Sequence, residues 1–209
     1  MFSLQTIFGK GDKFYGLLEA SASAARESTH ALAELLATPA SQRSLEKFKL
    51  ARQREKDLAA RISQELVNTF VTALEREDIE ALSNVLYKIP KVIEKFAERY
   101  YLASHRLGDV DFISRAKMLE ESCIVLEEMV GQLRKGMNIE TSKALNDKMQ
   151  AIESEADRQI LEMYRDSYLN ENDPIRYLIQ KDLFELLEKA IDRCRDAGNV
   201  VHHIILKNS

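Results

Sequence analysis

Apolar residues recur at spacings of three and four along almost the whole chain of 209 residues, and no strand-like alternation competes with them. This period predicts amphipathic α-helices, because residues three and four apart lie on one helix face. We expect six long helices with short turns, and therefore an all-α fold of antiparallel neighbours. The expected helices cover approximately residues 13–37, 44–70, 75–100, 112–135, 139–168 and 174–206.

Proline and glycine mark several of the expected helix ends. Pro39 stops the first helix, and Ser41 or Ser44 is the next N-cap. Gly136 suits a C-terminal cap, and Asp173-Pro174 is a cap followed by proline at the first helical position. Pro90 lies inside the third helix, where the missing backbone donor predicts a kink.

The chain reads as a tandem duplication with an offset of 101 residues. Apolar positions match at this offset, for example Leu82 with Leu183. The predicted units are 1–106 and 107–209, with the boundary at Leu107-Gly108-Asp109. We expect each unit to be a three-helix bundle, and the two to form one compact domain.

Composition narrows the class of protein. The chain has 7 Gly, 3 Pro, no Trp and a net charge of −4, which argues against nucleic acid as the main ligand. Cys123 and Cys194 fall on apolar stripes and are expected to be buried free thiols. No apolar run approaches the length of a membrane span, and Met1–Lys10 lacks the features of a secretory signal. We therefore expect a cytoplasmic protein.

Charge is divided unevenly between the two copies. Residues 1–104 carry 15 Lys and Arg against 14 Asp and Glu, whereas residues 105–209 carry 15 against 20. Some acidic residues of the second copy lie four positions apart on its last two helices and so share a helix face: Glu153 and Asp157 on the first of these helices, and Glu188, Asp192 and Asp196 on the second. Glu185 extends the second row. Like charges at this spacing repel, and a bound cation would offset the repulsion. Oxygen ligands alone favour Mg²⁺, Mn²⁺, Ca²⁺ or Fe³⁺. A solvated acidic face, neutralised by nearby Lys and Arg, is the alternative.

Four segments resemble PhoU-like proteins, which accompany low-affinity inorganic phosphate transporters in prokaryotes. Phe70-Val-Thr-Ala-Leu-Glu-Arg-Glu-Asp-Ile79 resembles the signature turn of that family. Glu153-Ser-Glu-Ala-Asp157 and Glu188-Lys-Ala-Ile-Asp192 are similar to its E-x-x-x-D metal motifs, and Phe8-Gly-Lys10 fits its beginning. The resemblance covers essentially the whole chain.

The resemblance implies two three-helix bundles with metal on acidic faces and a role in phosphate uptake and its regulation. We expect a non-enzymatic accessory of an inorganic phosphate transporter, acting at its cytosolic face and peripheral to the inner face of the membrane. Self-association into a homo-oligomer is a further possibility. The implied cofactor is Fe, Mg, Mn or Ca in the second copy only, with these candidate ligands: Glu153, Asp157, Glu188 and Asp192, with Asp196 or Glu185. The alternatives are a metal-dependent hydrolase or phosphatase using the same carboxylates, and a metal-free helical adaptor.

The first copy departs from the metal pattern. The offset of 101 places Arg52, Lys56, Tyr87 and Lys91 where the second copy has acids, and other registers retain at most one acid. Ammonium and guanidinium groups cannot ligate a cation, so no metal is expected there. This copy is either an ordinary surface or a site for an anion: phosphate, an acidic partner or a lipid headgroup. The candidate residues for the anion are Arg52, Lys56, Lys88, Lys91 and Lys95.

Overall fold

The chain forms an all-α bundle, as the hydrophobic period predicts. The computed structural model describes residues 4–108 and 110–209, and side chains within 13–108 and 110–209. Within these ranges there are seven α-helices and no strand. The helices are α1 Leu4–Ala37, α2 Glu46–Asn68, α3 Arg76–Leu86, α4 Lys88–Ala103, α5 Ile113–Lys135, α6 Ile139–Asn170 and α7 Pro174–Asn208. Two short 3₁₀ turns follow α1 and α4, at Ala40–Gln42 and Ser104–Arg106.

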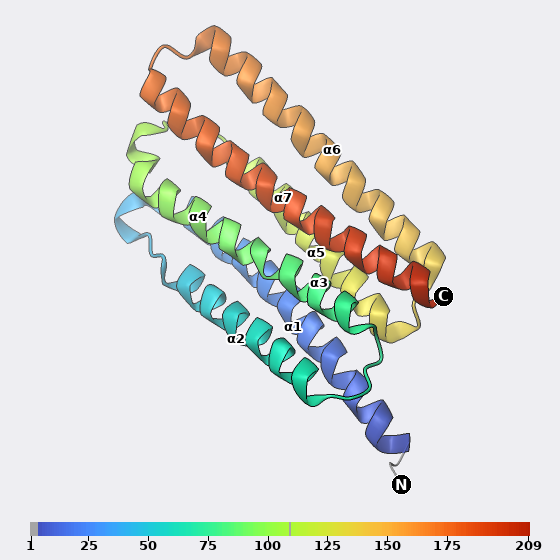
Figure 1. The fold of residues 1–209 in the computed structure, drawn as a ribbon. Helices are drawn as coiled ribbons and strands as arrows, with labels where there is room; N and C mark the ends of the chain where they lie inside the picture. The colour runs from blue at the N-terminus through green and yellow to red at the C-terminus, as the bar shows by residue number, and fades with distance from the viewer. Residues whose placement is uncertain (1–3, 109) are drawn as a thin grey trace.

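The helices lie side by side in two matching groups (Figure 1). In the first group α2 packs on α1, α3 and α4, and in the second α6 packs on α5 and α7. The groups meet through α1 against α5 and through α3 and α4 against α7. Helices α2 and α6 therefore lie on opposite outer sides of the bundle. Each packs along the last helix of its own group, α4 or α7, and the surface along this contact is called a seam below.

Pro90 breaks the third predicted helix into α3 and α4. Helix α3 ends at Leu86, four residues before the proline, and Tyr87 separates the two helices. A proline ring crowds the carbonyl four residues earlier and donates no hydrogen bond to it, so the break falls where that clash is expected. The predicted kink is confirmed as a helix boundary at Tyr87.

The predicted end signals of α5 and α7 are also present. Gly136 closes α5 with φ of 108°, a left-handed conformation that suits glycine. The Asp173 carboxylate accepts hydrogen bonds from the backbone N–H groups of Ile175 and Arg176, so it caps α7. The start of α2 differs slightly: its N-cap position is Leu45, one residue after the predicted Ser44.

Buried positions recur at the predicted offset of 101 residues. These pairs of core side chains have at most 2% exposure: Leu18 and Leu119, Phe48 and Met149, Leu82 and Leu183, Leu86 and Leu187. Arg26 on α1 pairs with Glu127 on α5 at 2.7 Å, and these positions are also 101 apart. Equivalent positions meet near a twofold axis, so the pair supports the same register. The division at residue 106 stays a prediction, and Asp109 of the predicted boundary lies outside the described residues, as do the first three residues of Met1–Lys10.

The two cysteines are buried free thiols, as predicted. Cys123 on α5 and Cys194 on α7 are fully buried, with their Sγ atoms 3.6 Å apart. The neighbouring thiol and burial both raise the pKa of Cys194. They therefore act as small apolar core residues.

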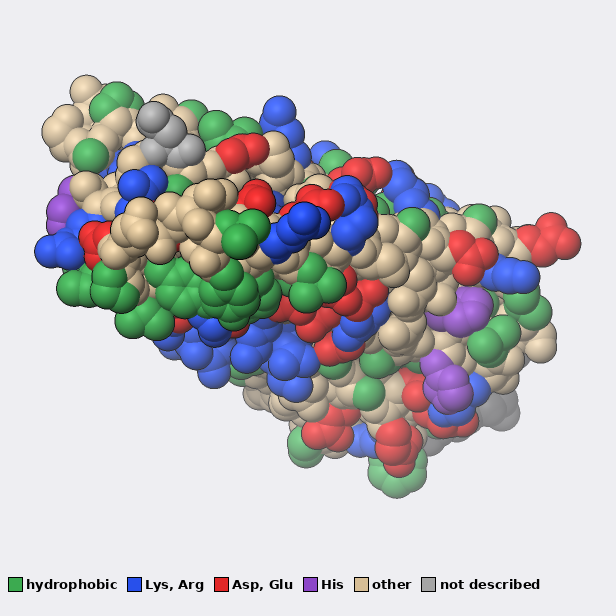
Figure 2. Space-filling model, turned by 90° about the horizontal axis from the view of Figure 1, so that it is seen from above, with side chains coloured by type: hydrophobic (Ala, Val, Ile, Leu, Met, Phe, Trp, Pro, Cys, Tyr) green, Lys and Arg blue, Asp and Glu red, His purple; other side chains and the backbone are tan. Residues whose placement is uncertain are grey.

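Apolar, basic and acidic side chains gather on different parts of the exposed surface. Large apolar side chains are exposed where α4 and α6 end and α7 begins: Leu102, Tyr168, Leu169, Ile175 and Leu178. Figure 2 shows hydrophobic side chains gathered toward one end of the visible face, beside separate groups of basic and acidic side chains. No helix among the described residues combines the length and apolar character needed to span a bilayer. The cytoplasmic location stays a prediction.

Candidate metal and anion sites on equivalent faces

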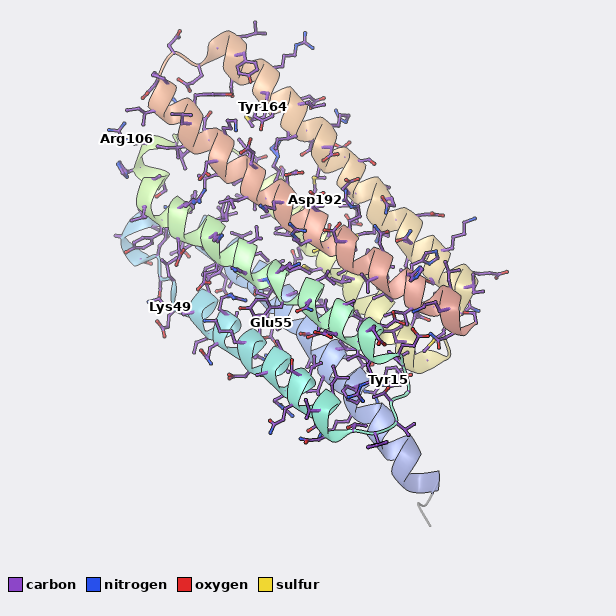
Figure 3. The ribbon with its side chains drawn as sticks, viewed as in Figure 1. Tyr15, Lys49, Glu55, Arg106, Tyr164 and Asp192 are labelled. Carbon is purple, nitrogen blue, oxygen red and sulfur yellow. The ribbon has the colours of Figure 1, made fainter. Side chains whose placement is uncertain are left out.

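The acidic residues of the second copy lie along the seam between α6 and α7. Glu153 and Asp157 come from α6, and the others come from α7. An open groove of about 530 Å³ runs along this seam. It is lined by Ile160, Tyr164, Glu185, Glu188, Lys189, Asp192 and Arg193. Figure 3 labels Tyr164 on α6 and Asp192 on α7, the two helices that form the groove.

Arg195 lies among these acids and neutralises part of them. Its guanidinium contacts Glu153 on the opposite helix, and it approaches Asp192 and Asp196 at 3.1 Å each. Arg193 also pairs with Asp196, at 2.9 Å. Glu153 and Asp196 are therefore engaged by arginine, whereas Asp192 shares Arg195 with two other carboxylates.

Glu188 lacks comparable neutralisation. Burial, together with the negative charges of Asp192 and Asp157, raises the pKa of Glu188 to about 7. Burial also raises the pKa of Asp192, with Arg195 opposing and Asp157 adding to the shift. These three carboxylates hold more negative charge than their surroundings compensate, which is the electrostatic condition that a bound cation relieves.

Glu185 is directed to other partners. It accepts hydrogen bonds from the Tyr164 hydroxyl and from the Lys181 ammonium, and both lower the pKa of Glu185. Burial and the Glu185 carboxylate in turn raise the pKa of Tyr164. Glu185 therefore belongs to a local network next to Glu188, at one end of the acidic row.

The equivalent seam of the first copy lies between α2 and the α3–α4 junction, and Arg52 is at its centre. Arg52 is 5% exposed and stacks on the Tyr87 ring, with 4.5 Å between the guanidinium carbon and the ring centroid. Its Nη2 donates to the Tyr87 hydroxyl at 2.9 Å, and its Nη1 donates to the Tyr87 carbonyl at 3.2 Å. Its Nε lies 3.4 Å from a Glu94 carboxylate oxygen. Arg52 thereby joins α2 to α4.

The two seams contain the same ion pair with opposite polarity. In the first copy Arg52 on α2 faces Glu94 on α4, and in the second Glu153 on α6 faces Arg195 on α7. Each residue lies 101 positions from its counterpart. Glu94 was missed as a member of the first site, although the offset that relates the acids to the lysines also relates Glu94 to Arg195. Arg195 itself was among the basic residues expected to neutralise the acidic row, and the structure places it there. The bridge is retained while the surrounding charge changes sign.

Lysines surround the basic seam without partners of their own. Arg52, Lys91 and Lys56 all lower the pKa of Tyr87, with the Arg52 hydrogen bond as the largest cause. Among the described residues, no ion pair or hydrogen bond involves the ammonium groups of these exposed lysines: Lys49, Lys56, Lys88, Lys91 and Lys95. The structure thus brings Arg52, Lys56, Tyr87 and Lys91 together, as the offset predicts.

The overall arrangement is shared with proteins of known structure. A PhoU-like phosphate regulatory protein from Shewanella oneidensis MR-1 matches with a TM-score of 0.78 and 14% identity, over 93% of this chain and 99% of that one. A second PhoU-like protein from the same organism matches with a TM-score of 0.79 and 13% identity over the same shares. The chain has the PhoU-like fold.

Sequence comparison identifies a further relative. UPF0111 protein YkaA of Bacillus subtilis (strain 168) is 26% identical over 149 residues, which is 70% of this chain and 71% of that protein. No protein-family model matches the chain. The all-α, PhoU-like fold expected from the sequence motifs is confirmed, with the third predicted helix present as α3 and α4.

Within this fold the acidic side chains of the second copy have the ligand chemistry that a hard cation needs, but they are not arranged around a common point. Glu188, Asp192 and Asp157 supply only oxygen ligands and excess negative charge. Yet in the described part of the chain no group of three or more His, Cys, Asp or Glu side chains stands in position to hold a metal ion. Binding would require the carboxylates to turn toward a common point, with Arg195 releasing Asp192. The metal site stays a prediction.

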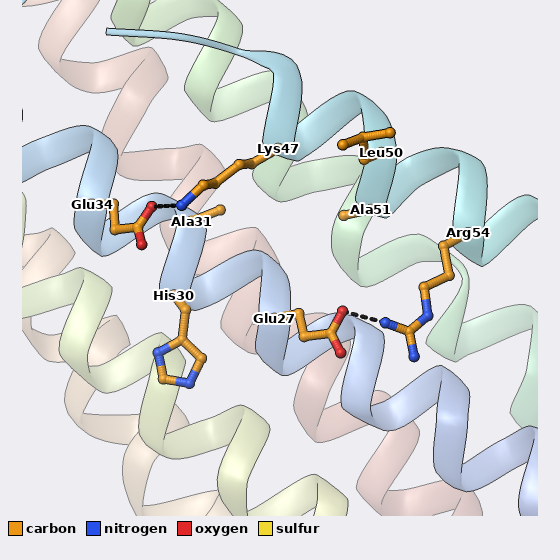
Figure 4. A pocket seen from close by; sticks show the side chains of 8 residues that line it. All are labelled: Glu27, His30, Ala31, Glu34, Lys47, Leu50, Ala51 and Arg54. Carbon is orange, nitrogen blue, oxygen red and sulfur yellow. Dashed lines mark hydrogen bonds and ion pairs between the residues drawn. The ribbon is translucent and has the colours of Figure 1, made fainter. Parts of the chain in front are cut away.

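A further hollow between α1 and α2 has its charges already paired (Figure 4). Lys47 pairs with Glu34, and Arg54 pairs with Glu27, across the gap between the two helices. His30 at its edge lies 3.1 Å from Glu120 on α5. This outer side of α2 is therefore internally neutralised, in contrast to the lysine-rich side that faces α4.

Proposed function

We propose that the chain is a non-enzymatic regulator of inorganic phosphate transport that binds a hard cation between α6 and α7 and acts on the cytosolic face of a phosphate transporter. The PhoU-like fold over 93% of the chain supports the phosphate role, because both structural neighbours are PhoU-like and one is described as a phosphate regulatory protein. The observation that supports the cation site is the cluster of the half-buried Glu188 and Asp192 with Asp157, where burial and the neighbouring carboxylates together raise the pKa of Glu188 to about 7.

A bound cation would take the place of the proton that Glu188 holds in this cluster. Glu188, Asp192 and Asp157 are the ligands that the electrostatics support best, since their mutual repulsion is the least compensated. Glu153 and Asp196 already contact Arg195, so they are better suited to orient the site from outside. Binding by ligands from both helices would join α6 to α7 and fix the surface that the second copy shows to a partner.

Metal analysis of the purified protein tests the ligand assignment. We expect the Glu188→Ala and Asp192→Ala double variant to lose bound Mn²⁺ or Fe³⁺ that the wild-type protein retains after dialysis. The matched control is the Glu155→Ala and Glu162→Ala double variant, which removes the same charge from exposed pairs with Arg158 on α6. Equal metal content in all three proteins would reject these ligands.

Phosphate uptake by cells tests the regulatory role. A strain that lacks the protein is complemented with the wild type or with the Glu188→Ala and Asp192→Ala variant, and uptake of radiolabelled phosphate is measured. We expect loss of the protein to change the uptake rate, and the metal-site variant to restore it less well than the wild type. Identical uptake with and without the protein would contradict the proposal.

A further inference from the structure

The seam between α2 and α4 holds more positive charge than its partners neutralise. Arg52 is paired with Glu94, but Lys56 and Lys91 approach the same tyrosine and make no ion pair or hydrogen bond among the described residues. Lys49 lies one turn before Arg52 on α2, where Figure 3 labels it, and its charge also acts on Glu94. Unpaired ammonium groups repel one another, so an anion placed between them stabilises the surface.

The buried arginine prepares a hydrogen-bond donor for such an anion. The Tyr87 oxygen accepts from Arg52 Nη2, so the phenol keeps its own hydrogen to donate outward. Stacking on the ring and the bond to the Tyr87 carbonyl hold this tyrosine at the helix break. Lys56 lies one turn beyond Arg52 on α2, and Lys91 one turn beyond Tyr87 on α4. A phenol hydroxyl and two ammonium groups thus converge from two helices.

We propose that Tyr87, Lys56 and Lys91, oriented by Arg52, form a receptor for a phosphate group, carried either as the free inorganic ion or on a lipid headgroup. A phosphate group offers three acceptor oxygens and a charge between −1 and −2, which matches one neutral donor and two cationic donors. The site goes beyond the proposed function, because it lies on the other copy and requires no metal.

Glu94 gives the receptor a means to distinguish phosphate from sulfate. Its carboxylate lies beside Arg52 and within the field of Lys56 and Lys49. Hydrogen phosphate carries a P–OH group that donates to a carboxylate, whereas sulfate carries no proton at neutral pH and is repelled. A phosphate monoester would bind in the same way at a pH where its phosphate group retains one proton.

Titration calorimetry with inorganic phosphate tests the receptor. We expect Lys56→Gln and Lys91→Gln each to weaken binding by about tenfold, the effect of losing one charge-assisted hydrogen bond. Tyr87→Phe keeps the ring against Arg52 and removes only the hydroxyl, so binding should weaken by a factor of about three to ten. Lys135→Gln and Lys143→Gln remove charge from exposed lysines of the second copy and should leave binding unchanged. Sulfate should bind about tenfold more weakly than phosphate to the wild type.

Two further arms distinguish the sources of the phosphate group. The wild type and the Lys56→Gln and Lys91→Gln double variant are sedimented with vesicles of phosphatidylcholine, with and without phosphatidic acid. Binding of free phosphate alone assigns the inorganic ion, and lysine-dependent binding to phosphatidic acid alone assigns the headgroup; either supports the receptor. Binding of neither overturns it.

Self-association provides the remaining contrary outcome. The acidic seam of one molecule is opposite in charge to the basic seam of a second molecule, so the two seams attract each other. If the double lysine variant loses an oligomer seen by analytical ultracentrifugation while phosphate has no effect, the lysines bind a second copy of the chain and the phosphate receptor is wrong.

Discussion

The two halves of the molecule differ less in their packing than in the sign of one face. Buried positions coincide at an offset of 101 residues, and both halves tie their second helix to their last through one arginine and one glutamate. In the first half the arginine is on α2 and lysines surround it, whereas in the second the glutamate is on α6 and carboxylates surround it. The bridge is present with either polarity, because both members change together.

This difference shows how one fold can present opposite ligand preferences. Core packing depends on the apolar stripe of each helix, and the exposed lysines and carboxylates of the seam lie beside this stripe. The seam residues can therefore change charge without altering how the helices meet. Our two proposals together assign a cation to one copy of this bundle and an anion to the other.

The largest expected effect concerns the shared core. Leu86 and Leu187 are equivalent and fully buried, so Leu86→Ala and Leu187→Ala should each lower the free energy of unfolding by about 2–5 kcal/mol. Leu50 is 62% exposed, and Leu50→Ala should change it by less than about 0.5 kcal/mol. Urea denaturation followed by circular dichroism measures all three. A large loss at only one of the two equivalent leucines would break the comparison.

The next effect concerns the inverted bridges. Arg52→Ala removes a buried guanidinium and leaves Glu94 without its cation, so we expect a loss of about 2–4 kcal/mol in the free energy of unfolding. Arg54→Ala on the same helix removes an exposed pair with Glu27 and should cost less than about 1 kcal/mol. Adding Glu94→Arg to Arg52→Glu reproduces the polarity of the second copy. Recovery of part of the stability lost in Arg52→Glu alone is the expected result, and no recovery would show that the bridge is not exchangeable.

A smaller effect is the pH dependence of the acidic seam. Glu188 has a folded pKa of about 7 against an ordinary 4.5, so the folded state keeps a proton that the unfolded state loses between these values. Stability from this group is therefore complete below about pH 4.5 and is lost as the pH rises to about 7. With metal chelated, Glu188→Gln should exceed the wild type by about 1 kcal/mol at pH 8, after allowance for solvent screening, and match it near pH 4.

Denaturation curves at both pH values measure this difference, and Glu162→Gln, an exposed acid on α6 paired with Arg158, serves as the control. A Glu188→Gln variant that is less stable than the wild type at pH 8 would show that the carboxylates are not crowded. Added Mn²⁺ should stabilise the wild type more than the variant at pH 8, because the cation takes the place of the missing proton.

The smallest effect is spectroscopic. The cations around Tyr87 lower the pKa of its phenol, whereas burial and Glu185 raise the pKa of Tyr164. In an alkaline titration followed by phenolate absorbance, Tyr87→Phe should remove an early-ionising tyrosine, and Tyr164→Phe should remove a late one. If Tyr87→Phe leaves the early part of the curve unchanged, the basic seam is weaker than its lysines indicate.

The hydrophobic period and the end signals were enough to predict most helices and their approximate limits, although α1 begins at Leu4 and not near residue 13, and the third predicted helix is divided into α3 and α4. Asp173-Pro174 and Gly136 act within a few residues, so their roles could be predicted from local sequence. Pro90 predicted a distortion, but its form as a boundary at Tyr87, between two helices that both pack on α7, is visible only in the structure. Such tertiary effects have no local signal.

The candidate sites were predicted as rows of like residues, and the structure adds the oppositely charged members. Spacing along α7 shows that Glu188 and Asp192 share a face. It does not show that Arg195 reaches across to Glu153, because that contact depends on the distance between α6 and α7. The same limit applies to Glu94, whose pairing with Arg52 joins residues 42 positions apart. The offset of 101 relates these two bridges, and it was the one signal in the sequence that could have identified them.

The most direct test is a crossed calorimetric titration of one protein with two ions. Mn²⁺ and inorganic phosphate are each titrated into the wild type, the Glu188→Ala and Asp192→Ala variant, and the Lys56→Gln and Lys91→Gln variant. We predict that the acidic-seam variant loses Mn²⁺ binding and keeps phosphate binding, and that the lysine variant shows the reverse. Loss of both ions in either variant, or binding of neither ion by the wild type, would contradict the assignment of opposite ligands to the two equivalent faces.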